Sequence, residues 1–488
     1  MSSDATAAPA PRVPLHNIFT FGTLGLPIAA MAVIFGVYLP RHYVSLGING
    51  LKPGDAKAFI LVSAAIGIVR IVDVIFDPLV ALLMDRTKTP IGRYRPWLLL
   101  GAPLVLLGIY KVLIPTGSVS TVYLILWLLV TYAGLSMMNL GLAAWSAILA
   151  TTYNDRSRIF GWTQAMAVVG SVAILLLDKL TAGHITPGLK ASMPAIALIL
   201  IISLPVALFI CTVFTPEKVV PIPQRPKFRL ADYGKAIARP SMLRLVLADL
   251  FLTLGPGTTA PLYIYYFHDA KGFTIPDVAH LLISYIGAGI VGALVWSRTA
   301  QRFGKHRTVQ IACVCYSITQ ATLMALPRVY GQHYPWTDAI PTYIGMFAVG
   351  FCSSAFLLLV RSMIADVADE VRLEQQQDLT SLLFSMVTTT TKIGASITVL
   401  IVFPILALVH YNGAEGAHNT KQAIFGLEMC YLFAPVILVW AGGAMFFGYK
   451  LDATRHAQIR AELESHDEAA ALESLTGPTP MSEPAAAG

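Results

Sequence analysis

Twelve apolar runs, each long enough to cross a bilayer as a helix, constrain the fold of this chain more than any other feature. A transmembrane helix needs about 20 apolar residues, whereas a spanning β-strand needs only about ten, with alternating polarity. We therefore expect an all-α membrane protein. The expected spans cover approximately residues 18–40, 58–84, 96–115, 121–150, 160–181, 193–214, 242–268, 277–300, 308–327, 340–366, 379–411 and 424–449.

The composition agrees with many spans rather than with a soluble enzyme carrying one anchor. The 488 residues are 56% hydrophobic and only 12% charged, against about 25% charged in soluble domains. The net charge of +7 follows the expected membrane topology, so we expect no nucleic-acid partner. The five cysteines lie in apolar runs, and the sequence has neither a Walker loop nor a metal-ligand motif. We therefore expect no enzyme activity, no cofactor and no metal centre.

The longest and most polar internal connection divides the chain into two halves of six helices. It spans 215–241 and contains five prolines, and a basic, glycine-containing loop follows the second expected span of each half. We therefore expect twelve transmembrane helices in two six-helix halves, 18–214 and 242–449. The remaining parts are an N-terminal tail, 1–17, the central loop, 215–241, and a partly disordered C-terminal tail, 450–488.

The distribution of Lys and Arg predicts the orientation. With the N-terminus inside, 21 of the 34 basic residues fall on the inner side and nine on the outer side, and four lie within spans. Inner loops carry the excess of positive charge. Both tails and the central loop are therefore expected in the cytoplasm.

A charged stripe interrupts the second apolar run. Arg70, Asp73 and Asp77 fall on one face of a helix, and the two carboxylates are about 6 Å apart at one turn's spacing. Charges within hydrocarbon are costly and usually functional. We interpret the pair as a coupling-ion site for H⁺ or Na⁺; the alternative is a structural ion-pair ladder to another helix.

Lys392, in the eleventh expected span, lies at a similar depth to these aspartates. By helical rise it is about 20 Å from the cytoplasmic end, whereas Asp77 is about 12 Å and Asp73 about 18 Å from that end. The lysine of one half can therefore meet the aspartates of the other near the bilayer midplane, where carriers bind substrate. It would act as a counter-ion displaced by the cation, or as a purely structural partner.

Four motifs, in order along the chain, resemble the glycoside–pentoside–hexuronide:cation symporters of the major facilitator superfamily, of which melibiose permease is the best-known member. They are Asp73-Val74-Ile75-Phe76-Asp77-Pro78 with the following basic loop, Tyr153-Asn154-Asp155-Arg156-Ser157-Arg158, Met363-Ile364-Ala365-Asp366-Val367-Ala368-Asp369 and Thr391-Lys392-Ile393-Gly394. The resemblance implies the major facilitator fold. It also implies cation binding at Asp73 and Asp77, with Lys392 near the cation and sugar sites.

The sugar-binding part of that family pattern is altered. Pro27 stands where the permease has a sugar-binding carboxylate, Gly141 replaces a carboxylate of the fourth span, and Thr163 or Gln164 replaces an arginine of the fifth. Galactoside specificity therefore does not carry over. We place Asn139 with the cation site, and the candidate substrate-binding residues are Arg70, Trp145, Gln164, Thr388 and Lys392.

Charged residues at the cytoplasmic ends of the spans form a candidate gate. Opposite charges on the two halves would close the inner side, although the basic loops could serve only to fix topology. The gate residues are Asp85, Arg86, Gly92, Arg93, Arg95, Asp366 and Asp369.

The sequence thus predicts a secondary active transporter that couples H⁺ or Na⁺ to uptake of a sugar or glycoside-like solute by alternating access. The alternative within the superfamily is a carrier of a lipid-like or amphiphilic solute, and a channel or membrane-embedded enzyme fits less well. We expect a monomer in a bacterial inner membrane, with the small-molecule substrate and the lipid bilayer as its partners.

Overall fold

The computed structural model describes residues 13–465 except 88, 118, 150–152, 183–188, 218–238, 330–334, 376–379, 415, 450, 452–454, 460 and 464. The elements of the first half are α1 (Leu15–Gly22), α2 (Gly25–Val33), η1 (Ile34–Tyr38), α3 (Leu39–Leu46), α4 (Ala56–Arg86), α5 (Arg95–Leu113), α6 (Thr121–Leu149), α7 (Tyr153–Ala182) and α8 (Leu189–Phe214). Those of the second half are α10 (Pro240–Ile264), η2 (Tyr265–Ala270), α11 (Ile275–Phe303), α12 (Lys305–Ala325), α13 (Trp336–Gln375), α14 (Thr380–Leu408) and α15 (Lys421–Ala444).

These elements make an all-helical, multi-span membrane protein, as the sequence predicted. Within the described ranges, eleven helical segments are long and apolar enough to cross a membrane, and α7 adds the shorter apolar stretch Gly161–Leu176. Most of the expected central loop, 215–241, lies outside the described residues, as does much of the expected tail, 450–488.

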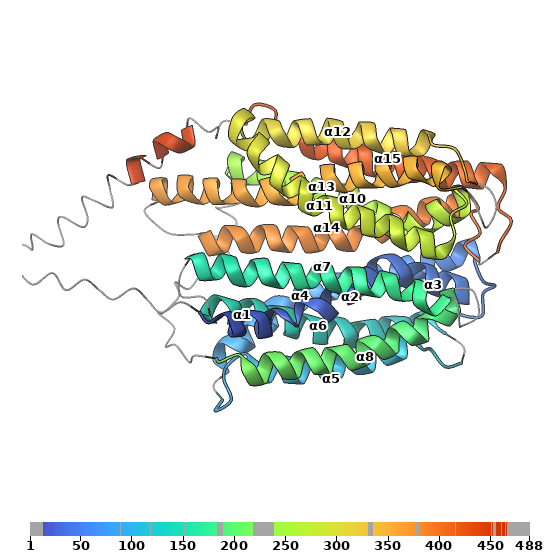
Figure 1. Cartoon of the computed structure of the whole chain (residues 1–488), viewed down its shortest axis with the longest axis horizontal. Coiled ribbons are helices and arrows are strands. Elements are labelled where there is room, and N and C mark those ends of the chain that lie inside the picture. Colours follow the sequence, from blue (N-terminus) through green and yellow to red (C-terminus); the bar gives the residue numbers. More distant parts are fainter. Residues whose placement is uncertain are drawn as a thin grey trace, which may run out of the picture.

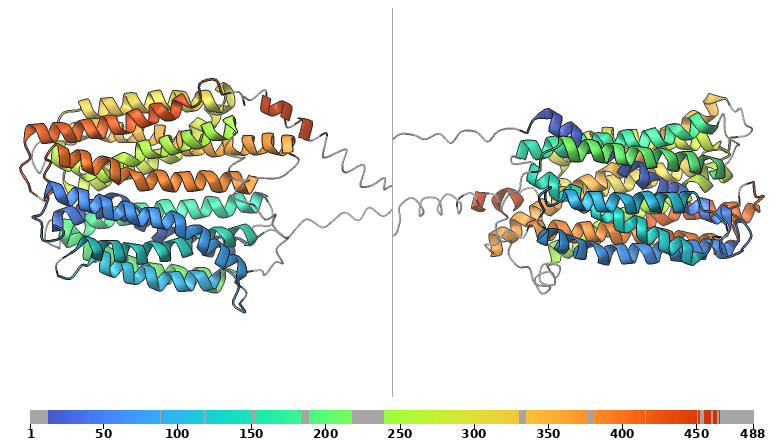
Figure 2. Two further views of the ribbon diagram at one scale, coloured as in Figure 1. Left: turned by 180° about the vertical axis from the view of Figure 1, so that it is seen from behind. Right: turned by 90° about the horizontal axis from the view of Figure 1, so that it is seen from below.

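The two halves lie side by side, with α1–α8 forming one block and α10–α15 the other (Figures 1 and 2). Contacts between the blocks run through α4 with α14, through α7 with α11, and through η1 and α3 with α10. The charged stripe of the sequence therefore belongs to one of the few helices that touch the other half.

Local sequence explains how α4 and its neighbours are held. Asp55 caps α4, because its carboxylate accepts the backbone N–H of Lys57 at 2.8 Å. Within the first half, α5 and α6 approach closely at Gly101 and Gly134. A Cβ at Gly101 would lie 2.7 Å from the Gly134 carbonyl oxygen, so a larger residue would push the helices apart.

The first span of each half contains a π-helical segment: η1 lies between α2 and α3, and η2 follows α10. Such widened turns are rare and often mark functional positions. Arg41 follows η1 by three residues, and Asp269 lies within η2. The two halves therefore repeat a local irregularity at one end of the bundle.

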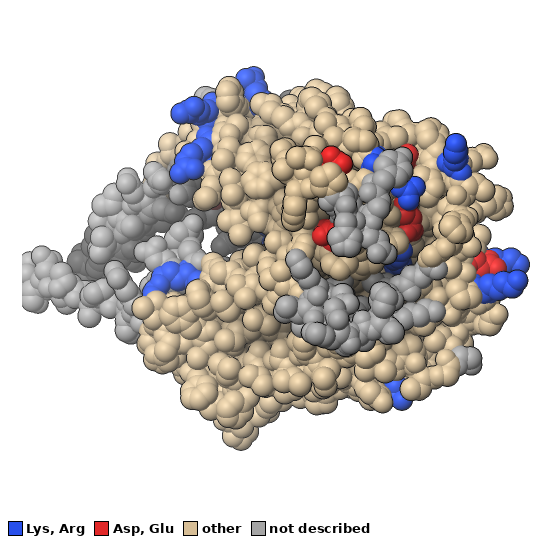
Figure 3. Space-filling model, turned by 45° about the vertical axis from the view of Figure 1, so that its right-hand side comes forward, with Lys and Arg blue, Asp and Glu red and all other residues tan. Residues whose placement is uncertain are grey.

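We call the end where α1 begins and the helical segment 455–463 lies the terminal face, and the other end the opposite face (Figure 1). Between the charged ends, the surface in view carries few charged side chains (Figure 3). Large apolar side chains such as Leu126, Phe209 and Ile344 are exposed on the helices. A belt of this kind suits contact with lipid.

Candidate cation and substrate site

The charged stripe of α4 lies in the interior of the bundle. The side chains of Asp73 and Asp77 are only 6% and 14% exposed. They face α14 of the second half and α6 of their own half, both of which pack against α4. Pro78 follows directly and cannot donate a helical hydrogen bond to the carbonyl of residue 74.

Lys392 of α14 crosses the boundary between the halves to reach both aspartates. Its Nζ forms an ion pair with Asp77 Oδ2 and lies 3.9 Å from Asp73 Oδ2. The depth match expected from helical rise is therefore realised as a direct contact. One ammonium thus serves two carboxylates, and a bound cation would compete with it for them.

Ser136 of α6 completes the surroundings of Asp73. Its hydroxyl donates a 2.6 Å hydrogen bond to Asp73 Oδ1. Asp77 differs, because its Oδ1 is buried and has no hydrogen-bond partner among the described residues. Asp77 therefore keeps one oxygen without a partner beside the lysine.

Sequence reasoning missed Ser136 and chose Asn139, which lies three residues further along the same helix. Asn139 is exposed, and its amide donates to the Leu135 carbonyl at 2.9 Å. The signal was present, because Ser136 is a hydroxyl residue in an apolar run, but only the fold shows that it faces Asp73.

Arg70 lies one turn from Asp73 toward the opposite face. Its guanidinium stacks over the ring of Tyr132 on α6, 4.3 Å from the ring centre. A cation–π contact of this kind stabilises a guanidinium away from water. Arg70 thus adds positive charge near the carboxylates while keeping its stacking partner in its own half.

The other predicted substrate residues lie in three different settings. Trp145 is fully buried; it packs edge-on against Phe21 at 5.6 Å and has the Arg95 guanidinium 5.4 Å from its ring. It lies nine residues beyond Ser136, or about 13 Å along α6. Gln164 is exposed on α7, and Thr388 belongs to α14 although its side chain lies outside the described part.

At the terminal face, the loop after α4 is fastened to the end of α8. The Glu217 carboxylate accepts the backbone N–H groups of Arg93, Tyr94 and Arg95 at 2.6, 2.8 and 3.3 Å. Gly92 has φ +119°, and a Cβ there would lie 2.1 Å from Glu217 Oε2. Sequence reasoning missed Glu217, because nothing in its neighbourhood marks it as an anchor for a loop more than 120 residues away.

Other contacts reinforce the same loop within the first half. Arg93 Nε donates to the Met84 carbonyl at 3.0 Å, and Arg95 Nη2 donates to the Thr215 carbonyl at 2.6 Å. Arg86 is exposed, and the side chain of Asp85 lies outside the described part.

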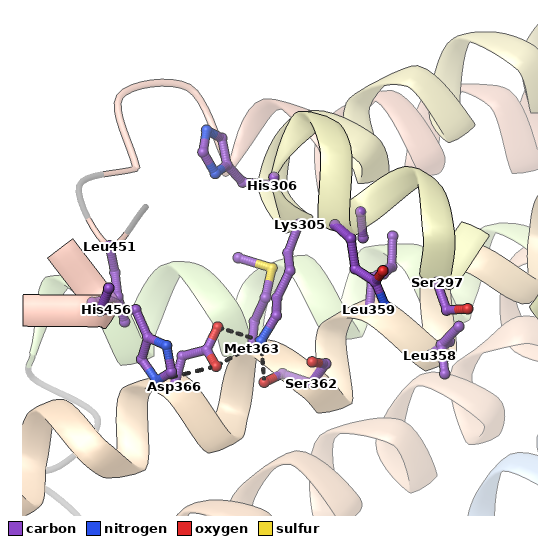
Figure 4. Close-up of a pocket in the computed structure, with 14 residues that line it drawn as sticks. Ser297, Lys305, His306, Leu358, Leu359, Ser362, Met363, Asp366, Leu451 and His456 are labelled. Atoms are coloured by element: carbon purple, nitrogen blue, oxygen red, sulfur yellow. Dashed lines mark hydrogen bonds and ion pairs between the residues drawn. The ribbon is translucent and has the colours of Figure 1, made fainter. Parts of the chain in front are cut away.

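The acidic end of α13 pairs within the second half. The two carboxylate oxygens of Asp366 accept hydrogen bonds from the Lys305 ammonium at 2.6 and 2.7 Å, and His456 lies 3.5 Å from Asp366 (Figure 4). His456 also lies 3.1 Å from Asp369. A pocket of about 400 Å³ adjoins the Lys305–Asp366 pair. In the described chain, Asp366 thus pairs within its own half, whereas we expected it to pair across the two halves. The contacts of Glu217 also stay within the first half.

Pairing between the halves occurs at the opposite face instead. Arg41, 1% exposed, lies 3.3 Å from Asp269, and Asp269 also contacts Tyr411 and His268. We call these four residues the opposite-face cluster. The Arg41 guanidinium also covers the Tyr265 ring at 4.8 Å, although its Nε and Nη1 have no hydrogen-bond partner among the described residues.

Backbone and aromatic contacts close the same end. The Gly413 N–H donates to the Gly54 carbonyl at 3.3 Å, and Phe59 packs within 5.1–6.1 Å of Tyr265, Phe403 and Tyr411. Burial raises the pKa of Tyr411, so its hydroxyl stays protonated and donates to Asp269. Sequence reasoning missed this cluster, although Arg41 and Asp269 occupy similar places at the ends of the first helix of each half.

Comparisons with known proteins agree with this architecture. Residues 20–453 match the family model described as MFS/sugar transport protein. YagG of Escherichia coli (strain K12), whose provisional name is glycoside/cation symporter, is 26% identical over 87% of this chain and 90% of its own. The mouse sodium-dependent lysophosphatidylcholine symporter 1 is 21% identical over 93% of this chain and 89% of its own.

A solved structure shows the same fold. The nucleoside transporter NupG superposes with a TM-score of 0.62 at 13% identity, covering 90% of this chain and all of NupG. The match to the family model extends over both halves, including the α4 carboxylates and Lys392. The chain therefore belongs to the MFS/sugar transport protein family of membrane transporters, and is a transporter rather than an enzyme.

Proposed function

We propose that this protein is a symporter that couples entry of H⁺ or Na⁺ to uptake of a sugar or glycoside-like solute. The observation that carries the proposal is the contact of Lys392 with Asp77 and Asp73 across the two halves. Alternating access requires a link between the halves that the coupling ion can change. This contact has that property, because the ion and the ammonium compete for the same carboxylates.

In the proposed cycle, the cation neutralises Asp77 and releases Lys392. The freed ammonium and Arg70 then face the space between the halves, where they bind substrate hydroxyl or acidic groups, together with Gln164 and Thr388. The cation therefore favours substrate binding. H⁺ suits the site better than Na⁺, because the described surroundings supply few oxygen ligands beyond the two carboxylates and Ser136.

We also propose that the terminal face is cytoplasmic, since it carries the excess of Lys and Arg. The proposal includes a bacterial inner membrane and a carrier that works as a monomer. The loop held by Glu217 and the pairs of Asp366 and Asp369 would form the inner gate when the halves approach at that face.

A lipid-like solute is the second candidate, because the lysophosphatidylcholine symporter matches both halves of this chain. The altered sugar-binding positions leave room for such a substrate. A panel of sugars, glycosides and lysophospholipids would distinguish the two.

The test is uptake into proteoliposomes under an imposed pH or Na⁺ gradient. Asp73→Asn and Asp77→Asn should abolish gradient-driven accumulation while leaving substrate counterflow measurable. Asp338→Asn, at the exposed start of α13, is the matched control and should accumulate like wild type. If both α4 variants accumulate substrate like wild type, the coupling proposal is wrong.

A further inference from the structure

A third carboxylate lies inside the bundle, on the second half. Asp249 of α10 is 2% exposed. Its Oδ2 lies 2.9 Å from the hydroxyl oxygen of Thr391 on α14. Thr391 directly precedes Lys392, so Asp249 contacts the helix turn that carries the lysine.

The Thr391 hydroxyl faces two acceptors but has only one proton to donate. Its Oγ1 lies 2.9 Å from Asp249 Oδ2 and 2.9 Å from the Val387 carbonyl oxygen. A hydroxyl has one proton to donate, whereas an ionised carboxylate and a carbonyl only accept. Both contacts are complete if Asp249 is protonated, because its OH donates to Oγ1 while Thr391 donates to Val387.

No basic side chain among the described residues forms an ion pair with Asp249. Arg361 of α13 acts on the carboxylate electrostatically, but it forms no ion pair with it in the described chain. Lys392 of α14 is paired with Asp77. On α15, Glu428 pairs with Lys271 near the opposite face, and beside η1 and α3 Arg41 pairs with Asp269. An ionised carboxylate buried without a partner is costly, and a proton removes that cost.

We propose that Asp249 is a second proton-binding site of the carrier, on the half opposite Asp73 and Asp77, and that it holds its proton while Lys392 is paired with Asp77. The inference rests on the proposed coupling function of that cluster. The ion is a proton, because a metal cation requires several oxygen ligands and Asp249 has one hydroxyl neighbour among the described side chains. Loss of the proton would place a negative charge beside the Lys392 turn, in competition with Asp77 for the ammonium.

Infrared difference spectroscopy on the purified, reconstituted carrier tests the protonation directly. Wild type at neutral pH should show the C=O band of a buried carboxylic acid, and Asp249→Asn should lack it. Thr391→Val should keep the band but shift it to higher frequency, because the acid loses its hydrogen-bond acceptor. Asp338→Asn should leave it unchanged. A spectrum identical in wild type and Asp249→Asn would overturn the proposal.

The number of protons transported per substrate provides a second readout. It also distinguishes the proposal for Asp249 from the proposal that Asp73 and Asp77 couple ion and substrate transport. Asp249→Asn keeps a neutral donor toward Thr391, so counterflow should persist while the number of protons moved per substrate falls by one. An unchanged proton-to-substrate ratio would overturn the role of Asp249 in transport. If instead Asp77→Asn accumulates substrate normally while the infrared band remains, the coupling proposal fails and the protonated state of Asp249 stands.

Discussion

At the scale of single residues, the cation cluster depends on one lysine from the other half. Lys392 neutralises Asp77, and Ser136 supports Asp73. Removing one partner of a buried ion pair leaves the other charge uncompensated. The remaining carboxylate then has a greater tendency to bind whatever cation is available.

Lys392→Gln should therefore strengthen binding of the coupling cation. We expect the half-saturating cation concentration for counterflow to fall by on the order of tenfold, because the competing ammonium is gone, equivalent to about 1.4 kcal/mol. Lys421→Gln, at the exposed start of α15, should have no effect. An unchanged half-saturation in Lys392→Gln would show that the ammonium does not compete with the cation.

Ser136→Ala should lower the stability of the protein. The substitution leaves Asp73 without its hydroxyl donor, and a hydrogen bond to a charged group contributes about 1.5–3 kcal/mol. Thermal unfolding in detergent should show the loss, with Ser297→Ala as the control, because Ser297 of α11 is half-buried and its hydroxyl bonds to its own helix. Equal midpoints for the two variants would argue against a structural role for this hydrogen bond.

At the scale of elements, the loop after α4 is a rigid connection, because one carboxylate from the end of α8 accepts three of its backbone N–H groups. Any movement of α4 at the terminal face must therefore carry the end of α8 with it. This linkage joins α4 to α8 at the terminal face.

Gly92→Ala should weaken that connection. The added Cβ would displace the Glu217 carboxylate and leave the N–H groups of 93–95 without their acceptor, costing about 1–3 kcal/mol. Gly117→Ala is the matched control, because Gly117 also has positive φ, +86°, but faces open space. Thermal midpoints should fall more for Gly92→Ala; equal shifts would mean that backbone strain alone accounts for the effect.

The sequence predicted the positions of the helices better than it predicted which side chains contact one another. Length and hydropathy placed α4 and α14 correctly, because a spanning helix needs a long apolar run whatever surrounds it. The rise per residue of a helix predicted that Lys392 lies at a depth similar to that of Asp73 and Asp77, and the three side chains are in contact. The sequence did not predict the roles of Ser136, Glu217 and Arg41. These roles depend on which helices are neighbours in the fold, and the sequence alone does not show this.

At the scale of the whole molecule, the halves meet firmly at the opposite face, through Arg41 and Asp269, and the pairs of Glu217 and Asp366 at the terminal face stay within each half. This arrangement corresponds to closure on the side away from the termini. The opposite-face cluster is then the part of the molecule that must separate for the carrier to open there.

Arg41→Gln should shift the population toward the state open at the opposite face. Breaking a buried pair costs about 3–5 kcal/mol, comparable to the few kcal/mol that separate two conformations. Spin labels at Gly50 and His418, on exposed loops of the two halves, should report a longer distance by pulsed electron paramagnetic resonance. Lys57→Gln should keep the short distance, and a short distance in Arg41→Gln as well would rule out the cluster as the closing contact.

The incomplete bonding of Arg41 lowers the stability of the state that is closed at the opposite face. Two of its guanidinium nitrogens are buried without acceptors among the described residues, and each unmade hydrogen bond costs about 1–3 kcal/mol. A fully bonded arginine would deepen the closed state by that amount and slow reopening by roughly one to several powers of ten. The two vacant bonds therefore favour turnover over tight sealing, so substitutions that supply the missing acceptors should yield a more stable protein that transports more slowly.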